Sequence, residues 1–157
     1  MKVTRLGRRP LPPGNVPGRC AGFAMPYLSF HVSRDVSQSQ AQAVADTLTE
    51  LTATLLGKKR ELTAVEITCA KAGRWYVGAQ DVASQSQVGF YLEIKVTEGT
   101  NTKGEKAQYV SAVFDAIAQI FGDLAPASYI VVHEVHADAW GYAGQTQEYR
   151  YIRGKSL

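Results

Sequence analysis

Cysteine is scarce in this sequence, and long apolar runs are missing. The 157 residues contain two cysteines, Cys20 and Cys69, which are too few for a disulfide framework and too far apart for the tight clusters that hold zinc. We therefore expect two unpaired thiols in a reducing, cytoplasmic compartment, and no metal site. No apolar stretch approaches the roughly 18 residues needed to cross a bilayer, so we expect no membrane segment.

Acidic residues are missing from residues 1–24. This stretch carries a charge of +5, whereas the other 12 basic and all 14 acidic residues give residues 25–157 a charge of −2. It also holds four of the six prolines, which predicts an irregular leader, or upstream sequence that is removed or never translated. Because the basic charge does not lie on the expected folded domain, 25–157, we expect no nucleic-acid binding. The basic residues of the leader are Lys2, Arg5, Arg8, Arg9 and Arg19.

The domain repeats itself at an offset of about 65 residues, which predicts a first repeat of about 26–88 and a second of about 89–157. Each repeat begins with apolar alternation, the period of a strand. Further along the chain, each repeat contains a second apolar segment and then an aromatic-glycine turn. The matching segments are Tyr27–Val32 and Tyr91–Val96, Val65–Thr68 and Tyr129–His133, and Trp75–Ala79 and Trp140–Gly144.

A helix is expected between the two strands of each repeat. The capping boxes Ser37–Gln40 and Thr102–Glu105 mark the starts, and Gly57 and Gly122 should form left-handed caps at the ends. The basic run Lys58–Arg60 then follows the first helix and is expected to be a solvated turn. The expected buried stripes are Val44, Leu48, Leu51 and Leu55, and Val110, Val113, Phe114, Ile117, Ile120 and Phe121.

These elements predict an α/β fold made of two fused βαβ repeats. A short strand–helix–strand crossover makes its two strands parallel. Neither repeat can cover its sheet alone, so we expect one four-stranded sheet with both helices on one face. The other face is left uncovered, which favours oligomerisation.

The Met25-Pro26 start, the repeat and the two aromatic-glycine turns together resemble the fused members of the 4-oxalocrotonate tautomerase superfamily. The likeness covers Pro26 to about Arg150. It implies a tautomerase (MIF-like) fold, a homotrimer, no cofactor, and a small 2-oxo or enol acid as substrate. It also implies an N-terminal proline as general base. Such a secondary amine, if buried, has a lowered pKa and can move a proton alpha to a carbonyl.

Four residues are candidates for this site. Pro26 would be the catalytic base, although a proline is also common at the start of a strand. The resemblance makes Arg34, Arg74 and Trp75 candidates for substrate binding, but solvated arginines and a tryptophan packed in a trimer are the alternatives. The second repeat has Phe90 where the first has Pro26, so we expect one site per chain.

The sequence also departs from its apparent relatives. Ala64 and Tyr129 stand where the short tautomerases carry a second arginine. Thr97 and Thr100 replace two arginines of the chloroacrylate dehalogenases, so Glu134, which matches the water-activating carboxylate of those enzymes, is expected to be structural. Water-adding dehalogenation is therefore disfavoured.

Two functions remain open. If the chain begins at Pro26, it is expected to be a tautomerase. If the leader is retained, the nitrogen of Pro26 is an amide without basicity. In that case the chain is expected to be a catalytically silent trimeric scaffold or binding protein.

Overall fold

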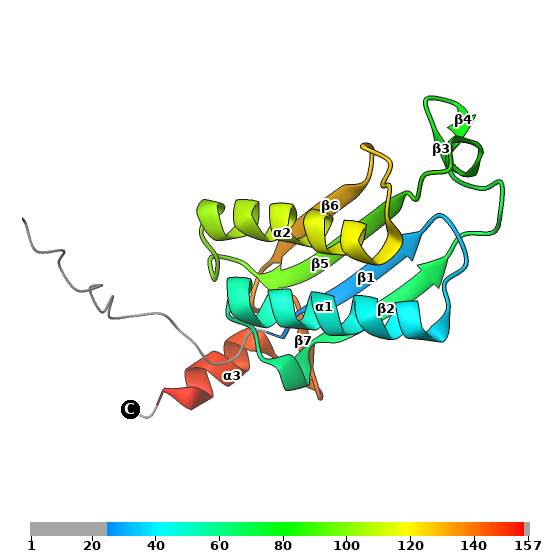
Figure 1. The fold of residues 1–157 in the computed structure, drawn as a ribbon. Coiled ribbons are helices and arrows are strands. Elements are labelled where there is room, and N and C mark those ends of the chain that lie inside the picture. Colours follow the sequence, from blue (N-terminus) through cyan, green and yellow to red (C-terminus); the bar gives the residue numbers. More distant parts are fainter. Residues whose placement is uncertain (1–24, 156–157) are drawn as a thin grey trace, which may run out of the picture.

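A computed structural model describes residues 25–155, so the expectation for the leader lies outside the described residues. Both predicted βαβ units are present (Figure 1). The first consists of β1 (Tyr27–Val32), α1 (Gln38–Leu56) and β2 (Ala64–Cys69), and the second of β5 (Phe90–Thr97), α2 (Lys103–Phe121) and β6 (Tyr129–Val135).

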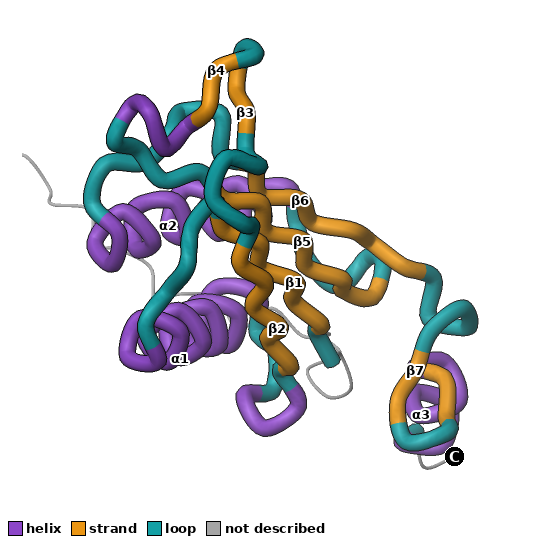
Figure 2. Tube along the Cα trace, turned by 90° about the vertical axis from the view of Figure 1, so that its right-hand side faces the viewer, coloured by secondary structure: helices purple, strands orange, loops and turns teal. Residues whose placement is uncertain are grey.

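The main sheet has the strand order β2-β1-β5-β6. β1 is parallel to β2 and β5 is parallel to β6, while the two repeats join through the antiparallel pair of β1 and β5. α1 and α2 lie side by side over one face of the sheet (Figures 1 and 2). The predicted fold is therefore confirmed.

The core lies between the helices and the sheet, because alternate residues of the two central strands point toward the helices and are buried. A buried hydrogen bond of 3.0 Å joins Thr52 Oγ1 of α1 to the Tyr109 hydroxyl of α2. The predicted stripe of α2 was wrong at Val110, which is 37% exposed, whereas Tyr109 is fully buried. The central core residues are Leu28, Phe30, Val32, Phe90, Leu92, Ile94 and Val96.

Both capping boxes are present as predicted. The two helix ends differ, however. Gly57 has φ 64° and ψ 31°, the expected left-handed cap. Gly122 has φ 85° and ψ −126°, so the prediction of a left-handed cap was wrong there. After Gly122 the chain must leave in an extended direction, because Leu124 forms a parallel bridge with Val88.

Each repeat ends in an arm that extends from the main sheet (Figures 1 and 2). The first arm, 75–85, contains β3 (Tyr76–Val77), β4 (Gln80–Asp81) and the 3-10 helix Val82–Gln85. The second arm, 140–154, contains β7 (Gly141–Tyr142), β8 (Gln145–Thr146) and α3 (Gln147–Gly154), a helix that was not predicted. Another 3-10 helix, Arg60–Leu62, precedes β2.

Candidate functional site

The main sheet has two ends, and equivalent positions of the two repeats lie at opposite ends. At the Pro26 end, β1 and β2 begin and β5 and β6 finish; at the Phe90 end, β5 and β6 begin and β1 and β2 finish. Pro26 directly precedes β1 and is buried. Its carbonyl oxygen accepts a hydrogen bond of 3.3 Å from the Ala64 amide, which ties it to β2.

Two predicted substrate-binding residues lie at the Phe90 end. Arg34 is exposed and follows Ser33, which is paired with Gly89 by two hydrogen bonds of 2.9 Å. Trp75 lies against the same glycine, since a Cβ added to Gly89 would be 2.7 Å from the indole Nε1. Gly89 therefore gives Trp75 the space to pack beside the end of β1.

Arg74 precedes Trp75 and is exposed. The three predicted binding residues are thus separated from Pro26 by the whole of β1. Six residues of strand span about 20 Å. Within one chain, the structure does not bring Pro26 together with Arg34, Arg74 or Trp75.

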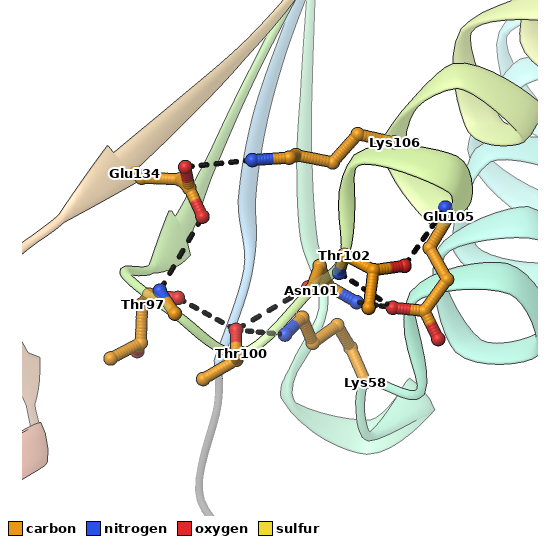
Figure 3. Close-up of polar contacts among 9 residues, drawn as sticks. Lys58, Thr97, Thr100, Asn101, Thr102, Glu105, Lys106 and Glu134 are labelled. Atoms are coloured by element: carbon orange, nitrogen blue, oxygen red, sulfur yellow. Dashed lines mark hydrogen bonds and ion pairs between the residues drawn. The ribbon is translucent and has the colours of Figure 1, made fainter.

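A cation that the sequence did not reveal lies at the Pro26 end (Figure 3). Lys58 is only 6% exposed, so the expectation of a solvated turn was wrong for this residue. Its Nζ donates a hydrogen bond of 2.8 Å to Thr100 Oγ1, in the turn between β5 and α2. Asn101 Nδ2 donates to the Leu56 carbonyl at 3.0 Å, which holds this turn against the end of α1.

The surroundings of Lys58 favour its neutral form. Burial lowers the pKa of Lys58 to about 8, although Glu105 and Glu134 act in the opposite direction. Desolvation of the ammonium therefore outweighs the attraction of two carboxylates. A buried lysine that titrates near neutral pH is a candidate for a functional site, because perturbed pKa values gather there.

The side chain of Glu134 connects β6 to α2. It accepts from Lys106 Nζ at 2.7 Å and from the Gly99 amide at 3.4 Å (Figure 3). The hydrogen bond from Lys106 is the main reason that the pKa of Glu134 is lowered. Nearby, the hydroxyl of Thr97 is buried and has no hydrogen-bond partner among the described residues.

The Phe90 end has no equivalent of this cation. At the offset of the repeat, Asp123 corresponds to Lys58 and Asp35 to Thr100. Asp123 is exposed and accepts a long hydrogen bond, 3.4 Å, from Gln87 Nε2. Phe90, in the place of Pro26, is fully buried and stacks on Phe30 with 5.5 Å between ring centroids.

The face of the sheet opposite the helices is polar and half-open. Tyr27 donates a hydrogen bond to Glu66 across β1 and β2. Glu93 contacts both Lys95 and His133, and the Lys95 hydrogen bond is the main cause of the lowered pKa of Glu93. The described chain leaves this face without a covering layer (Figure 2).

The second arm contains buried polar atoms that lack partners. Gln147 is 3% exposed, and neither its Oε1 nor its Nε2 has a hydrogen-bond partner among residues 25–155. Val82 occupies the same place in the first arm and is 1% exposed. The backbone amides of Val82 and Gln147 make equivalent 3.0 Å bonds to the carbonyls of Trp75 and Trp140. A hollow of about 340 Å³ adjoins this turn, and the arm that lines it follows β6 at the Pro26 end of the sheet.

Comparison with known proteins gives a family match in the second repeat and a fold match over most of the chain. Residues 91–149 match the model of the Tautomerase family, described as tautomerase enzyme. The resemblance to the 4-oxalocrotonate tautomerase superfamily is confirmed. No curated protein matches the chain by sequence.

Solved structures share the tautomerase fold over most of the chain. A fused 4-OT (4-oxalocrotonate tautomerase) described as a wild type symmetric trimer has a TM-score of 0.70 and 14% identity, covering 79% of this chain and 98% of that one. A native fused 4-OT has a TM-score of 0.66 and 17% identity, with coverage of 78% and 96%. A macrophage migration inhibitory factor-like protein from Entamoeba histolytica has a TM-score of 0.65 and 18% identity, with coverage of 78% and 98%.

The described residues contain neither a metal-binding cluster nor a membrane-spanning helix. Between residues 25 and 155, no group of three or more His, Cys, Asp or Glu side chains could hold a metal ion. No helix in that part of the chain has both the length and the apolar character needed to cross a membrane.

Proposed function

We propose that this chain is a cofactor-independent tautomerase that interconverts the keto and enol forms of a small 2-oxo acid, with Pro26 as general base when it is the first residue. The observation that carries this proposal is the placement of a buried proline and a buried lysine at the same end of the sheet. The tautomerase fold and the family match of the second repeat support it.

The chemistry follows from these two groups. The secondary amine of an N-terminal Pro26 takes the proton alpha to the carbonyl and leaves an enolate. The Lys58 ammonium stabilises the negative charge on the enolate oxygen or the carboxylate. The protonated proline then returns the proton to complete the tautomerisation. The burial of Pro26 suits this role, because a buried amine has its pKa lowered toward neutrality.

We assign the enolate cation to Lys58 because of its location. Arg34 and Arg74 lie about the length of β1 away from Pro26 in the same chain. No carboxylate among the described residues forms an ion pair with Lys58, whose hydrogen-bond partner is the neutral Thr100. Its charge is therefore available to an anionic substrate.

We also propose a homotrimer in which Arg34, Arg74 and Trp75 act from a neighbouring copy. β2 and β6 are the edge strands of the main sheet, and such edges seek partners. Two similar fused 4-OT structures are described as trimers. Assembly would give the open face a cover and can bring the Phe90 end of one chain to the Pro26 end of another.

The alternative is a catalytically silent trimeric scaffold. A retained leader would leave Pro26 as an internal amide, whose lone pair is delocalised into the preceding carbonyl. The intact mass of the native protein distinguishes the two starting points directly.

The test compares a protein that begins at Pro26 with the 157-residue form, using ketonisation of phenylenolpyruvate. The short form should be faster by about 10²–10⁴, the usual contribution of a general base. In the short form, Lys58→Met should lower kcat/KM by about 10²-fold, whereas Lys59→Met, at the exposed neighbouring position, should not. Equal rates for the two lengths would exclude the proline mechanism. Light scattering of both forms tests the trimer, and a monomer at micromolar concentration would contradict it.

A further inference from the structure

We propose that Lys58 is also a nucleophile whose neutral amine condenses with the carbonyl of a small 2-oxo acid to form an imine. The substrate class rests on the proposed function, but the reaction does not require Pro26 to be a base. Lysine amines that are desolvated in this way are the ones that form Schiff bases with carbonyl compounds.

The hydrogen bonds around Lys58 leave its lone pair unused. The hydroxyl of Thr100 has two acceptors for its own hydrogen, the Thr97 carbonyl oxygen at 2.6 Å and Asn101 Oδ1 at 3.3 Å, so its oxygen accepts from Lys58. Among the described residues this is the hydrogen bond that the Lys58 side chain makes. A neutral Lys58 is therefore held by one N–H, and its lone pair remains free for a substrate.

The two carboxylates that favour the charged form of Lys58 already accept hydrogen bonds from other groups. Glu105 accepts from the Thr102 amide at 2.9 Å, and Glu134 accepts from Lys106 at 2.7 Å. They favour the ammonium form of Lys58, but burial prevails and lowers its pKa to about 8. Near neutral pH, a much larger fraction of this amine is neutral than of an ordinary lysine with a pKa of about 10.4.

The architecture of the βαβ unit does not by itself require that Lys58 is buried. The fold makes the corresponding turn at the Phe90 end, where Asp123 takes the place of Lys58 and is exposed. Thr100 corresponds there to Asp35, which is also exposed. The βαβ unit can therefore pass from helix to strand without a buried charge, and the buried lysine is specific to the end that holds Pro26.

The proposed step is balanced without an oxidant or reductant. The Lys58 nitrogen attacks the carbonyl carbon at position 2 of the acid, and an N–C bond forms. The carbonyl oxygen then leaves as water with the two amine hydrogens, which gives the imine. Protonated, this imine acidifies the adjacent C–H bonds, so they can exchange with solvent even in a chain where Pro26 is an internal amide.

The experiment uses the 157-residue protein, in which the nitrogen of Pro26 cannot react. The protein is incubated with pyruvate and cyanoborohydride, which reduces any imine to a stable secondary amine, and peptide masses locate the adducts. At about pH 7.5, Lys58 should be labelled on the order of a hundredfold faster than Lys59, because about a quarter of the Lys58 amine is neutral, against about 0.1% of a lysine with the ordinary pKa of about 10.4. The Lys58 rate should rise as the pH passes through about 8. Lys58→Arg should remove this adduct, while Lys59→Arg should retain it.

Labelling of Lys58 equal to or slower than that of Lys59 would overturn the inference. The comparison is made within the wild-type chain, so it decides the matter even if Lys58→Arg fails to fold. If the short form ketonises phenylenolpyruvate while Lys58 stays unlabelled, the tautomerase proposal stands and the imine does not. If Lys58 is labelled while the short form is inactive, the imine proposal stands and the tautomerase proposal does not.

Discussion

The Pro26 end and the Phe90 end of the sheet are built from the same repeat but differ in the residue that follows each helix. Lys58 comes after a left-handed Gly57 and is buried against the turn that holds Thr100. Asp123 comes after Gly122, whose backbone is not left-handed, and it is exposed. The buried cation and the solvated anion thus follow helix caps of different backbone conformation, although the strands and helices on both sides match.

Pro26, which precedes β1, and Phe90, which begins β5, should differ most when they are truncated. Phe90→Ala should lower the free energy of unfolding by about 3–5 kcal/mol, because the ring is fully buried and stacked on Phe30. Pro26→Ala should lower it by about 1 kcal/mol or less, because the carbonyl bonded to Ala64 is retained. Urea unfolding measures both values. Similar losses would show that the two positions are structurally equivalent after all.

The pH dependence of stability should separate Lys58 from Asp123. The folded pKa of Lys58, about 8, lies below its unfolded value of about 10.4, so the unfolded chain binds more protons between these values. The free energy of unfolding should therefore rise by on the order of 2 kcal/mol from pH 8 to pH 10. Urea unfolding of Lys58→Met should lack this rise.

Asp123→Asn is the matched control, and it should keep the whole rise because Asp123 is exposed. Measurements should stop near pH 10, since burial raises the pKa of Tyr109 to about 12 and its unfolded hydroxyl begins to ionise there. The same slope in wild type and Lys58→Met would show that Lys58 is fully charged in the folded protein.

The two arms should show the smallest difference. Gln147→Val places in the second arm the residue type that fills the first, and it removes an amide without partners among the described residues. We expect thermal unfolding to show a gain of about 1 kcal/mol. The reciprocal Val82→Gln should cost about 1–3 kcal/mol, because it buries an amide where an apolar side chain lies. A loss for Gln147→Val would mean that the amide has a partner outside residues 25–155.

Local signals carried most of the fold prediction. The capping boxes of α1 and α2 and the alternating strands β1 and β5 depend on neighbours in sequence, so they were found correctly. The stripe of α2 was misplaced at Val110 because Tyr109 and Val110 are adjacent and both can be buried. In the structure Tyr109 is the buried residue, and its hydroxyl bonds to Thr52, which lies 57 residues away. α3 was missed because its eight residues are too few for a clear apolar period.

By itself the sequence determined the two βαβ units, their parallel crossovers and the asymmetry between Pro26 and Phe90, because periodicity, caps and chain reversals are short-range properties. Only the tertiary structure decided which charged groups share an end with Pro26. A lysine directly after a helix has the same sequence signature whether it is solvated or buried. Its burial here depends on the turn that holds Thr100, 42 residues away. The distance of Arg34 from Pro26 is likewise a consequence of the extended backbone of β1, which keeps residues eight positions apart at opposite ends of the sheet.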